Sequence, residues 1–172
     1  MKKIILLFAL VFATSMFAQD VIYKHSGETV KGKVVRLDEY TVVYKYEGED
    51  AENSISKYAI EKIVYKSGRT EEVTEKIEVK GEDDWEKVVI LEDKAYISGL
   101  KKSGEVRGKT GLINFQTGNT GDKKAEKKLK MAAAALGCPF ILMTADKTTV
   151  GANSNALGGS QAIKKGVGYK YN

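Results

Sequence analysis

The 172-residue sequence contains one cysteine, one histidine and one proline. A single cysteine excludes a disulfide within the chain and any zinc site built from several cysteines. Cys138 is flanked by Gly137, Pro139 and the apolar Phe140, so we expect it to be a small buried hydrophobic residue. Pairing with a second chain in an oxidising compartment is the alternative. Packing, rather than crosslinks, must therefore stabilise the fold.

The single histidine also restricts catalysis. A Ser-His-Asp or Cys-His arrangement would have to use His25, which we place in a turn and in a different module from Cys138. The acidic run of Glu82, Asp83 and Asp84 lacks the spaced oxygen ligands of a calcium loop. We therefore expect no catalytic, cofactor-binding or metal-binding residue, and no enzymatic activity.

Long apolar runs are missing except near the N-terminus. There, Lys2 and Lys3 precede an apolar run over 4–13, and small or polar residues follow it. This order predicts a secretory signal peptide over 1–18, cut after Ala18 or, alternatively, after Ser15. The run is shorter than the ~20 residues of a membrane-spanning helix. No cysteine lies near either cut, so we expect an exported protein, periplasmic or associated with the outer envelope, without a lipid anchor.

Strong charge of one sign is also missing. The first 18 residues hold two lysines and no acid, which leaves 26 basic and 23 acidic residues and a net charge of +3. Such a mild balance is not typical of a nucleic-acid-binding protein, so we expect no nucleic-acid partner. The most apolar later segment, 131–144, is interrupted by Gly137 and Pro139. We therefore expect no transmembrane segment in the mature chain.

Between residues 20 and 79 the sequence alternates between strand-like runs and turns. Val30 and Val34 alternate with Lys31 and Lys33, as in a half-buried strand. Glycine-containing segments at 25–28 and 67–69 are typical of tight turns. Strands are predicted at 21–24, 29–37, 40–46, 55–58, 62–66 and 70–79.

A small barrel-like module over 20–79 would bury the apolar side chains of these strands while limiting open sheet edges. The core residues that we expect are Val34, Val42, Tyr44, Ile63 and Val73.

Several short strings carry a resemblance to a known kind of module. They are DVIYK at 20–24, GKV at 32–34, VYK at 43–45 and IEKIVY at 60–65, ahead of the turn at 67–68. Together they resemble small all-β modules that follow signal peptides in Gram-negative envelope proteins of unknown function, similar to SH3-like or Sm-like barrels. The resemblance implies a fold and a compartment, and it carries no catalytic residue.

A second, α+β module is expected over 85–172, after a polar acidic linker at 80–84, with Trp85 as an anchor. Its main helix is predicted over 123–136, with Asp122 as N-cap and Gly137 as the residue that ends it. Strands are predicted at 86–91, 94–100, 105–109, 111–115 and 139–144. The whole chain is therefore expected to be α+β, with a small all-β barrel-like module followed by one main helix on a sheet.

The predicted helix places Ala125, Leu129 and Leu136 on one face and carries five lysines elsewhere. We interpret the lysines as a solvated surface, with contact to acidic lipid or an anionic polymer as the alternative. The strings AEKKLK at 125–130, AAAALG at 132–137, FIL at 140–142 and GVGYKY at 166–171 resemble helix-then-strand domains of small exported proteins and outer-membrane stress-sensor lipoproteins. The chain lacks the lipid-bearing and paired cysteines of those sensors.

Gly104 to Thr110 is similar to a phosphate-binding loop, but three residues separate Gly104 from Gly108 where such a loop has four. A strand, not a helix, is expected next, so we interpret the segment as a hairpin turn and expect no nucleotide. Two further glycine-rich stretches, 118–121 and 151–159, are predicted to be flexible loops.

These features favour an exported, non-enzymatic protein with a binding or structural role, its partner being an envelope protein or a cell-wall component. The alternative is a periplasmic protein that senses a small ligand or metal with the 151–159 loop. The sequence leaves the oligomeric state open.

Overall fold

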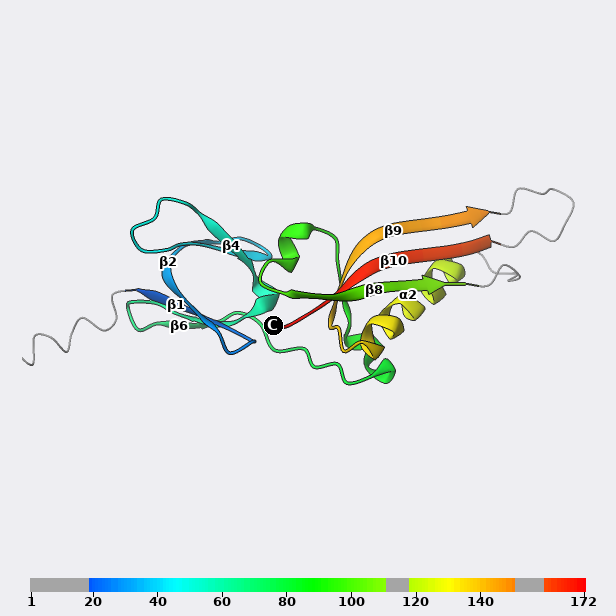
Figure 1. The fold of residues 1–172 in the computed structure, drawn as a ribbon, viewed down its shortest axis with the longest axis horizontal. Helices are drawn as coiled ribbons and strands as arrows, with labels where there is room; N and C mark the ends of the chain where they lie inside the picture. Colours follow the sequence, from blue (N-terminus) through cyan, green and yellow to red (C-terminus); the bar gives the residue numbers. More distant parts are fainter. Residues whose placement is uncertain (1–18, 111–117, 151–159) are drawn as a thin grey trace, which may run out of the picture. The chain divides into compact units, whose positions relative to one another are not determined.

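The computed structural model describes residues 19–110, 118–150 and 160–172. The predicted signal peptide, the strand predicted at 111–115 and the predicted loop at 151–159 lie outside these residues. The chain divides into two compact units, of which unit 1 ends at Glu75 and unit 2 runs from Lys76 to Asn172 (Figure 1). The structure is α+β, with two sheets and one main helix.

Unit 1 is an antiparallel sheet in the strand order β4-β3-β2-β1-β5-β6. Hairpin turns connect several of its strands, and Gly27 and Gly68 adopt φ of 88° and 85° in two of these turns, as the sequence predicts. The elements are β1 (Asp20–Lys24), β2 (Thr29–Leu37), β3 (Thr41–Lys45), β4 (Asn53–Ser56), the short helix η2 (Lys57–Ala59), β5 (Ile60–Val64) and β6 (Thr70–Glu72).

The long strand β2 pairs with β1 through its first half and with β3 through its second half. Its register shifts between Val34 and Arg36, and such a bulge increases the local bend of a strand. The strand order leaves β4 and β6 as the two edges, and no ladder joins them within the described residues. Closure of this curved sheet into a barrel therefore stays a prediction.

The core of unit 1 is aliphatic. Ile22, Val42, Ile60 and Ile63 are at most 1% exposed, and burying each such side chain contributes about 1.5–3 kcal/mol. Of the expected core residues, Val42, Tyr44 and Ile63 are buried, whereas Val34 and Val73 are only partly buried.

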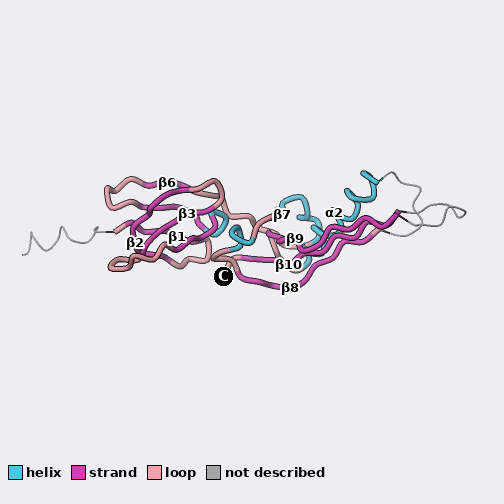
Figure 2. The backbone as a smooth tube through the Cα atoms, turned by 90° about the horizontal axis from the view of Figure 1, so that it is seen from above, coloured by secondary structure: helices cyan, strands magenta, loops and turns pink. Residues whose placement is uncertain are grey.

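Unit 2 contains a four-stranded sheet in the order β7-β9-β10-β8, in which β7 and β9 are parallel and the other pairs antiparallel. Strands β8, β9 and β10 run side by side, with the helix α2 packed against β8 and β10 (Figure 2). The elements are η3 (Glu82–Lys87), β7 (Val89–Leu91), η4 (Lys94–Ile97), β8 (Lys101–Lys109), α2 (Gly118–Ala135), β9 (Phe140–Val150) and β10 (Ser160–Lys170).

The predicted main helix is confirmed as α2, and so is its end at Gly137, which has φ of 63°. The N–H groups of Gly137 and Cys138 donate to the carbonyls of Ala134 and Ala133 at 2.9 Å each, the paired bonds of a Schellman motif. The expected N-cap was wrong. The helix begins at Gly118, so Asp122 lies inside it.

Helix and sheet approach closely in unit 2 because of glycine. A Cβ atom on Gly108 of β8 would lie 1.9 Å from the carbonyl oxygen of Ala125. Around this contact Leu129, Ala133, Cys138 and Ile141 form a buried cluster. Partly buried side chains pack against the cluster, among them Trp85.

Four other sequence expectations were wrong. The segment 94–100 begins as the 3-10 helix η4 rather than a strand, because the Asp93 carboxylate accepts a hydrogen bond from the Ala95 N–H at 2.7 Å and caps the turn. The strand expected over 70–79 ends at Glu72. Gly104 to Lys109 lies within strand β8, which agrees with the strand predicted at 105–109 and shows that the hairpin turn expected over 104–110 is wrong. Gly118 to Gly121 forms the start of α2 and is not a loop.

Candidate functional site

The candidate site is a groove in unit 1, at the end of the sheet where β1 begins. Its volume is about 590 Å³. The start of β1, the middle of β2, the end of β3, and the two turns β3–β4 and β5–β6 surround it. Its lining residues are Gln19, Asp20, Gly32, Lys33, Val34, Lys45, Tyr46, Glu47, Gly48, Glu49, Tyr65, Lys66, Ser67 and Arg69.

Asp20 lies at the floor of the groove and is only 8% exposed. Its Oδ2 accepts a hydrogen bond from the Val34 N–H at 2.8 Å, and its Oδ1 accepts one from the Lys66 N–H at 2.9 Å. Val34 belongs to β2 and Lys66 follows β5, the two neighbours of β1 in the sheet. The carboxylate therefore accepts hydrogen bonds from one backbone N–H group on each side of β1, at the point where β1 begins.

The β5–β6 turn forms one wall, and its side chains hold one another. The Tyr65 hydroxyl donates to Glu71 Oε2 at 2.8 Å. Arg69 pairs with the same oxygen at 2.9 Å and lies over the Tyr65 ring, 4.1 Å from its centroid. Burial, followed by the bond to Glu71, raises the pKa of Tyr65. The wall therefore presents a fixed aromatic ring at the groove.

The opposite wall contains Tyr46, which is 41% exposed. Its hydroxyl lies 3.4 Å from that of the buried Tyr44, and the two rings meet edge to face with centroids 5.4 Å apart. Burial raises the pKa of Tyr44 to about 12. The contact with the buried Tyr44 therefore holds Tyr46 in place at the groove.

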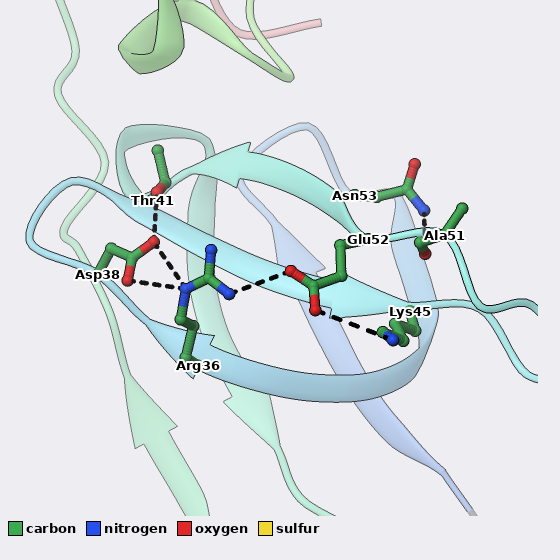
Figure 3. Close-up of polar contacts among 7 residues, drawn as sticks. All are labelled: Arg36, Asp38, Thr41, Lys45, Ala51, Glu52 and Asn53. Carbon is green, nitrogen blue, oxygen red and sulfur yellow. Dashed lines mark hydrogen bonds and ion pairs between the residues drawn. The ribbon is translucent and has the colours of Figure 1, made fainter.

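An ion-pair network fixes the β3–β4 connection beside this wall (Figure 3). Glu52 pairs with Arg36 of β2 at 3.1 Å and with Lys45 of β3 at 3.9 Å. Arg36 also pairs with Asp38 at 3.2 Å. Exposed pairs of this kind contribute little to stability because water screens them, so we interpret the network as positioning Lys45 and the connection that follows β3.

His25 and Cys138, the residue types most often used in nucleophilic catalysis, both lie where they contribute to the packing of the fold. His25 lies in the turn after β1, as predicted, and its Nε2 is 3.0 Å from Thr74 Oγ1. The Thr74 hydroxyl also lies within 3.0 Å of the Lys57 and Ile60 carbonyl oxygens. Cys138 is fully buried, as predicted, and is a free thiol.

The acidic run expected to be a linker contains the start of η3. There, Asp84 accepts a hydrogen bond from the Lys80 N–H at 2.9 Å and pairs with Lys87 at 2.6 Å. The pair with Lys87 and the bond from Lys80 lower the pKa of Asp84. Within the residues that the structure describes, no group of three potential metal ligands comes together. In the same residues, no helix is long and apolar enough to cross a membrane.

Charge is distributed unevenly between the units, which the whole-chain balance conceals. Residues 19–75 hold 9 basic and 12 acidic residues, a net charge of −3, whereas 76–172 hold 17 and 11, a net charge of +6. The excess lies in 101–172, with 13 basic and 4 acidic residues. Unit 2 is therefore considerably more basic than the mild overall charge suggests.

Sequence reasoning did not find the groove. Its residues come from four separate segments, and most are common strand or turn residues. One signal was present: an aspartate directly before the apolar run Val21 to Tyr23 is unusual in a buried strand position. That signal points to a partner for Asp20 without identifying Val34 or Lys66.

No protein-family model, curated protein or solved structure matches this chain. The resemblance of its two modules to envelope domains stays a prediction. A functional assignment must therefore come from the groove and the surfaces of this chain.

Proposed function

We propose that this chain is an exported, non-enzymatic binding protein of the cell envelope, and that its unit 1 groove holds an extended segment of a partner polypeptide. The observation that carries the proposal is the position of Asp20. Strand β1 begins there, between two neighbours whose chains continue past it, to Leu37 in β2 and into the β5–β6 turn.

The geometry of a sheet supports an extended occupant. Neighbouring strands lie about 4.8 Å apart, so the two chains flanking β1 are separated by about twice that spacing. The groove opens at the start of β1, beside Asp20 and between residues of these two chains. Extended peptides often bind by adding to such incomplete sheets, with main-chain bonds giving affinity and side-chain pockets giving specificity.

The side chains around the groove suit a polypeptide better than a uniformly charged ligand. Lys33, Lys66 and Arg69 provide positive charge, and Glu47 and Glu49 provide negative charge. Tyr46 and Tyr65 add aromatic surface, and tyrosine is enriched at protein interfaces. A segment with both apolar and charged side chains would complement this mixture.

The predicted barrel-like form of unit 1 is part of the proposal. A Cβ atom on Gly32 would lie 2.4 Å from the Lys45 carbonyl oxygen, so β2 and the end of β3 approach very closely where the sheet bends. This contact supports a sheet that curls toward closure and brings the β3–β4 and β5–β6 turns to the same groove.

Site-specific photocrosslinking tests the proposal. A photoreactive phenylalanine analogue replaces Tyr46 at the groove or, as a control, Tyr40, which is 36% exposed in the β2–β3 turn. In intact cells we expect the probe at 46 to capture a defined polypeptide, and peptide mapping should place the crosslink in one continuous segment. A synthetic peptide of that segment should then bind the purified protein and compete with the crosslink.

Equal capture by the probes at 46 and 40 would overturn the groove assignment, as would a captured segment whose synthetic peptide does not bind. Export is tested separately. N-terminal sequencing of the protein from the native host should give Gln19 as the first residue, and a cytoplasmic chain beginning at Met1 would show that the export prediction is wrong.

A further inference from the structure

A band of cationic side chains runs around one edge of the unit 2 sheet, independently of the unit 1 groove. Strand β8 is the edge strand, and its partner is β10. Along β8, Val106 and Gly108 are buried toward α2, so the exposed Arg107 and Lys109 point to the opposite face. Lys165 of β10 lies directly opposite Arg107 in the ladder.

The placement of Lys165 opposite Arg107 does not favour folding, because like charges directly across a ladder destabilise a sheet. Both side chains are exposed, and Lys147 of β9 extends the same face beside Ile163. Lys101 and Lys170 face each other in the same way further along this ladder, so this end of the sheet is distinguished by the number of cations that gather there and not by one like-charged pair.

The helix continues the band across the β8 edge. Lys128 of α2 donates a hydrogen bond from Nζ to the Lys109 carbonyl oxygen at 3.1 Å. Lys124 lies one turn before Lys128 and is exposed. The cationic band is therefore defined by Lys124, Lys128, Lys109, Arg107 and Lys165.

Acidic side chains offset only part of the charge of the band. Residues 101–172 contain four acids. Glu126 pairs with Lys130 and Asp146 pairs with Lys164, whereas the exposed Glu105 lies two residues before Arg107 on the same face of β8. Within the described part of the chain, no carboxylate lies within 4 Å of any nitrogen of the five band side chains. These charges are therefore available to an external anion.

We propose that the cationic band binds an acidic polysaccharide. A flat membrane surface would meet the sheet face or the helix, but not both sides of the β8 edge at once, whereas a flexible polymer can follow the band around it. A single-stranded nucleic acid would need exposed aromatic rings on which its bases stack, and β8 and α2, which carry four of the five band residues, contain no aromatic residue. An acidic sugar chain carries repeated anionic groups that match the repeated cations. It needs neither a flat surface nor aromatic rings.

Affinity measurements on two matched triple variants of the mature protein test this assignment. The band variant carries Arg107→Gln, Lys109→Gln and Lys165→Gln. The control variant carries Lys94→Gln, Lys101→Gln and Lys170→Gln, three exposed cations of the same unit away from the band. Both variants lose three positive charges, so a difference between their affinities reflects the position of the charges and not the net charge.

The probe is dextran sulfate, with neutral dextran as the control polymer. We expect the band variant to bind dextran sulfate at least about tenfold more weakly than wild type, and the control variant to stay within about threefold. The slope of log Kd against the logarithm of the salt concentration should also decrease by about two to three, and only for the band variant. NMR shift changes in the wild-type protein should map to β8, β10 and α2, which tests the site without any substitution.

Equal weakening of both variants would show an effect of net charge alone and overturn the proposal. Band-dependent binding that is tighter for a DNA duplex, or for phosphatidylglycerol vesicles, than for dextran sulfate would also overturn it, in favour of a nucleic acid or a membrane. So would shift changes that fall outside the band.

Discussion

Asp20 is the residue on which the groove depends. Its two oxygens satisfy backbone N–H groups on both neighbours of β1, at 2.8 and 2.9 Å. A buried donor that loses its partner costs about 1–3 kcal/mol. Asp20 therefore connects the stability of unit 1 to the shape of its proposed binding site.

We expect Asp20→Ala to lower the free energy of unfolding of unit 1 by about 2–4 kcal/mol, because both N–H groups lose their acceptor. Asp20→Asn keeps one acceptor oxygen and should cost about half as much. Hydrogen exchange at the Val34 and Lys66 amides measures the effect directly. Glu39→Ala, at an exposed position, is the control and should change stability by less than about 0.5 kcal/mol. Unchanged exchange at both amides in Asp20→Ala would contradict this account.

Tyr44 gives unit 1 a defined response to alkaline pH. Burial raises its pKa to about 12 in the folded protein, against about 10 in an unfolded chain. The stability that this shift contributes is complete below pH 10. It is lost as the pH rises toward 12, because the unfolded chain releases the proton first.

We expect the loss to be on the order of 2 kcal/mol, and Tyr44→Phe should remove it. Urea unfolding of unit 1 at pH 8, 10 and 11.5 provides the measurement. If the wild type and Tyr44→Phe lost stability in parallel over this range, the alkaline response would have to come from other groups.

At the scale of the secondary-structure elements, the packing of α2 on β8 depends on Gly108. A Cβ there would lie 1.9 Å from the Ala125 carbonyl oxygen, whereas a Cβ on Gly104 of the same strand would meet only the Leu136 side chain, at 3.6 Å. The two glycines of the segment that is similar to a phosphate-binding loop therefore differ sharply in their surroundings.

Gly108→Ala should lower the free energy of unfolding of unit 2 by about 3 kcal/mol or more, since helix and strand must separate. Gly104→Ala should be neutral or slightly stabilising. Trp85, the single tryptophan, packs against the unit 2 core, so its fluorescence during urea unfolding reports both effects. Similar midpoints for the two variants would show that the helix does not rest on Gly108 as closely as described.

The sequence predicted the elements whose signals are local. The main helix was recognised, over 123–136, because Ala125 and Leu129 repeat at helical spacing and Gly137 ends it, but its start at Gly118 was missed. The segment 94–97 was mistaken for a strand because its turn depends on one side-chain bond from Asp93, which no periodicity reveals. The groove was missed because Asp20 finds its partners 14 and 46 residues away.

At the scale of the whole molecule, the chain consists of two compact units with opposite net charge. Sequence patterns indicated a β-rich part followed by an α+β part. They did not reveal the charge asymmetry, because the total over the chain adds the −3 of unit 1 to the +6 of unit 2 and leaves only +3. The register of β8 with β10 was also needed to bring Arg107 opposite Lys165.

Two compact units should respond separately to local damage. We expect Asp20→Ala to leave the urea midpoint of Trp85 fluorescence unchanged, because substitutions without shared partners act independently. The same variant should lose protection from hydrogen exchange across β1, β2 and β5. A shift of the Trp85 midpoint by the full unit 1 effect would instead indicate that the chain unfolds as one cooperative body.

Because Cys138 is buried, the reactivity of its thiol reports how often unit 2 opens. The thiol is fully buried, and its Sγ donates to the Leu136 carbonyl at 3.7 Å. A thiol reagent can react only when α2 and β10 separate, so its rate measures how often the native state exposes this position. Because the chain has no other cysteine, the unmodified protein can report its own opening, including inside living cells.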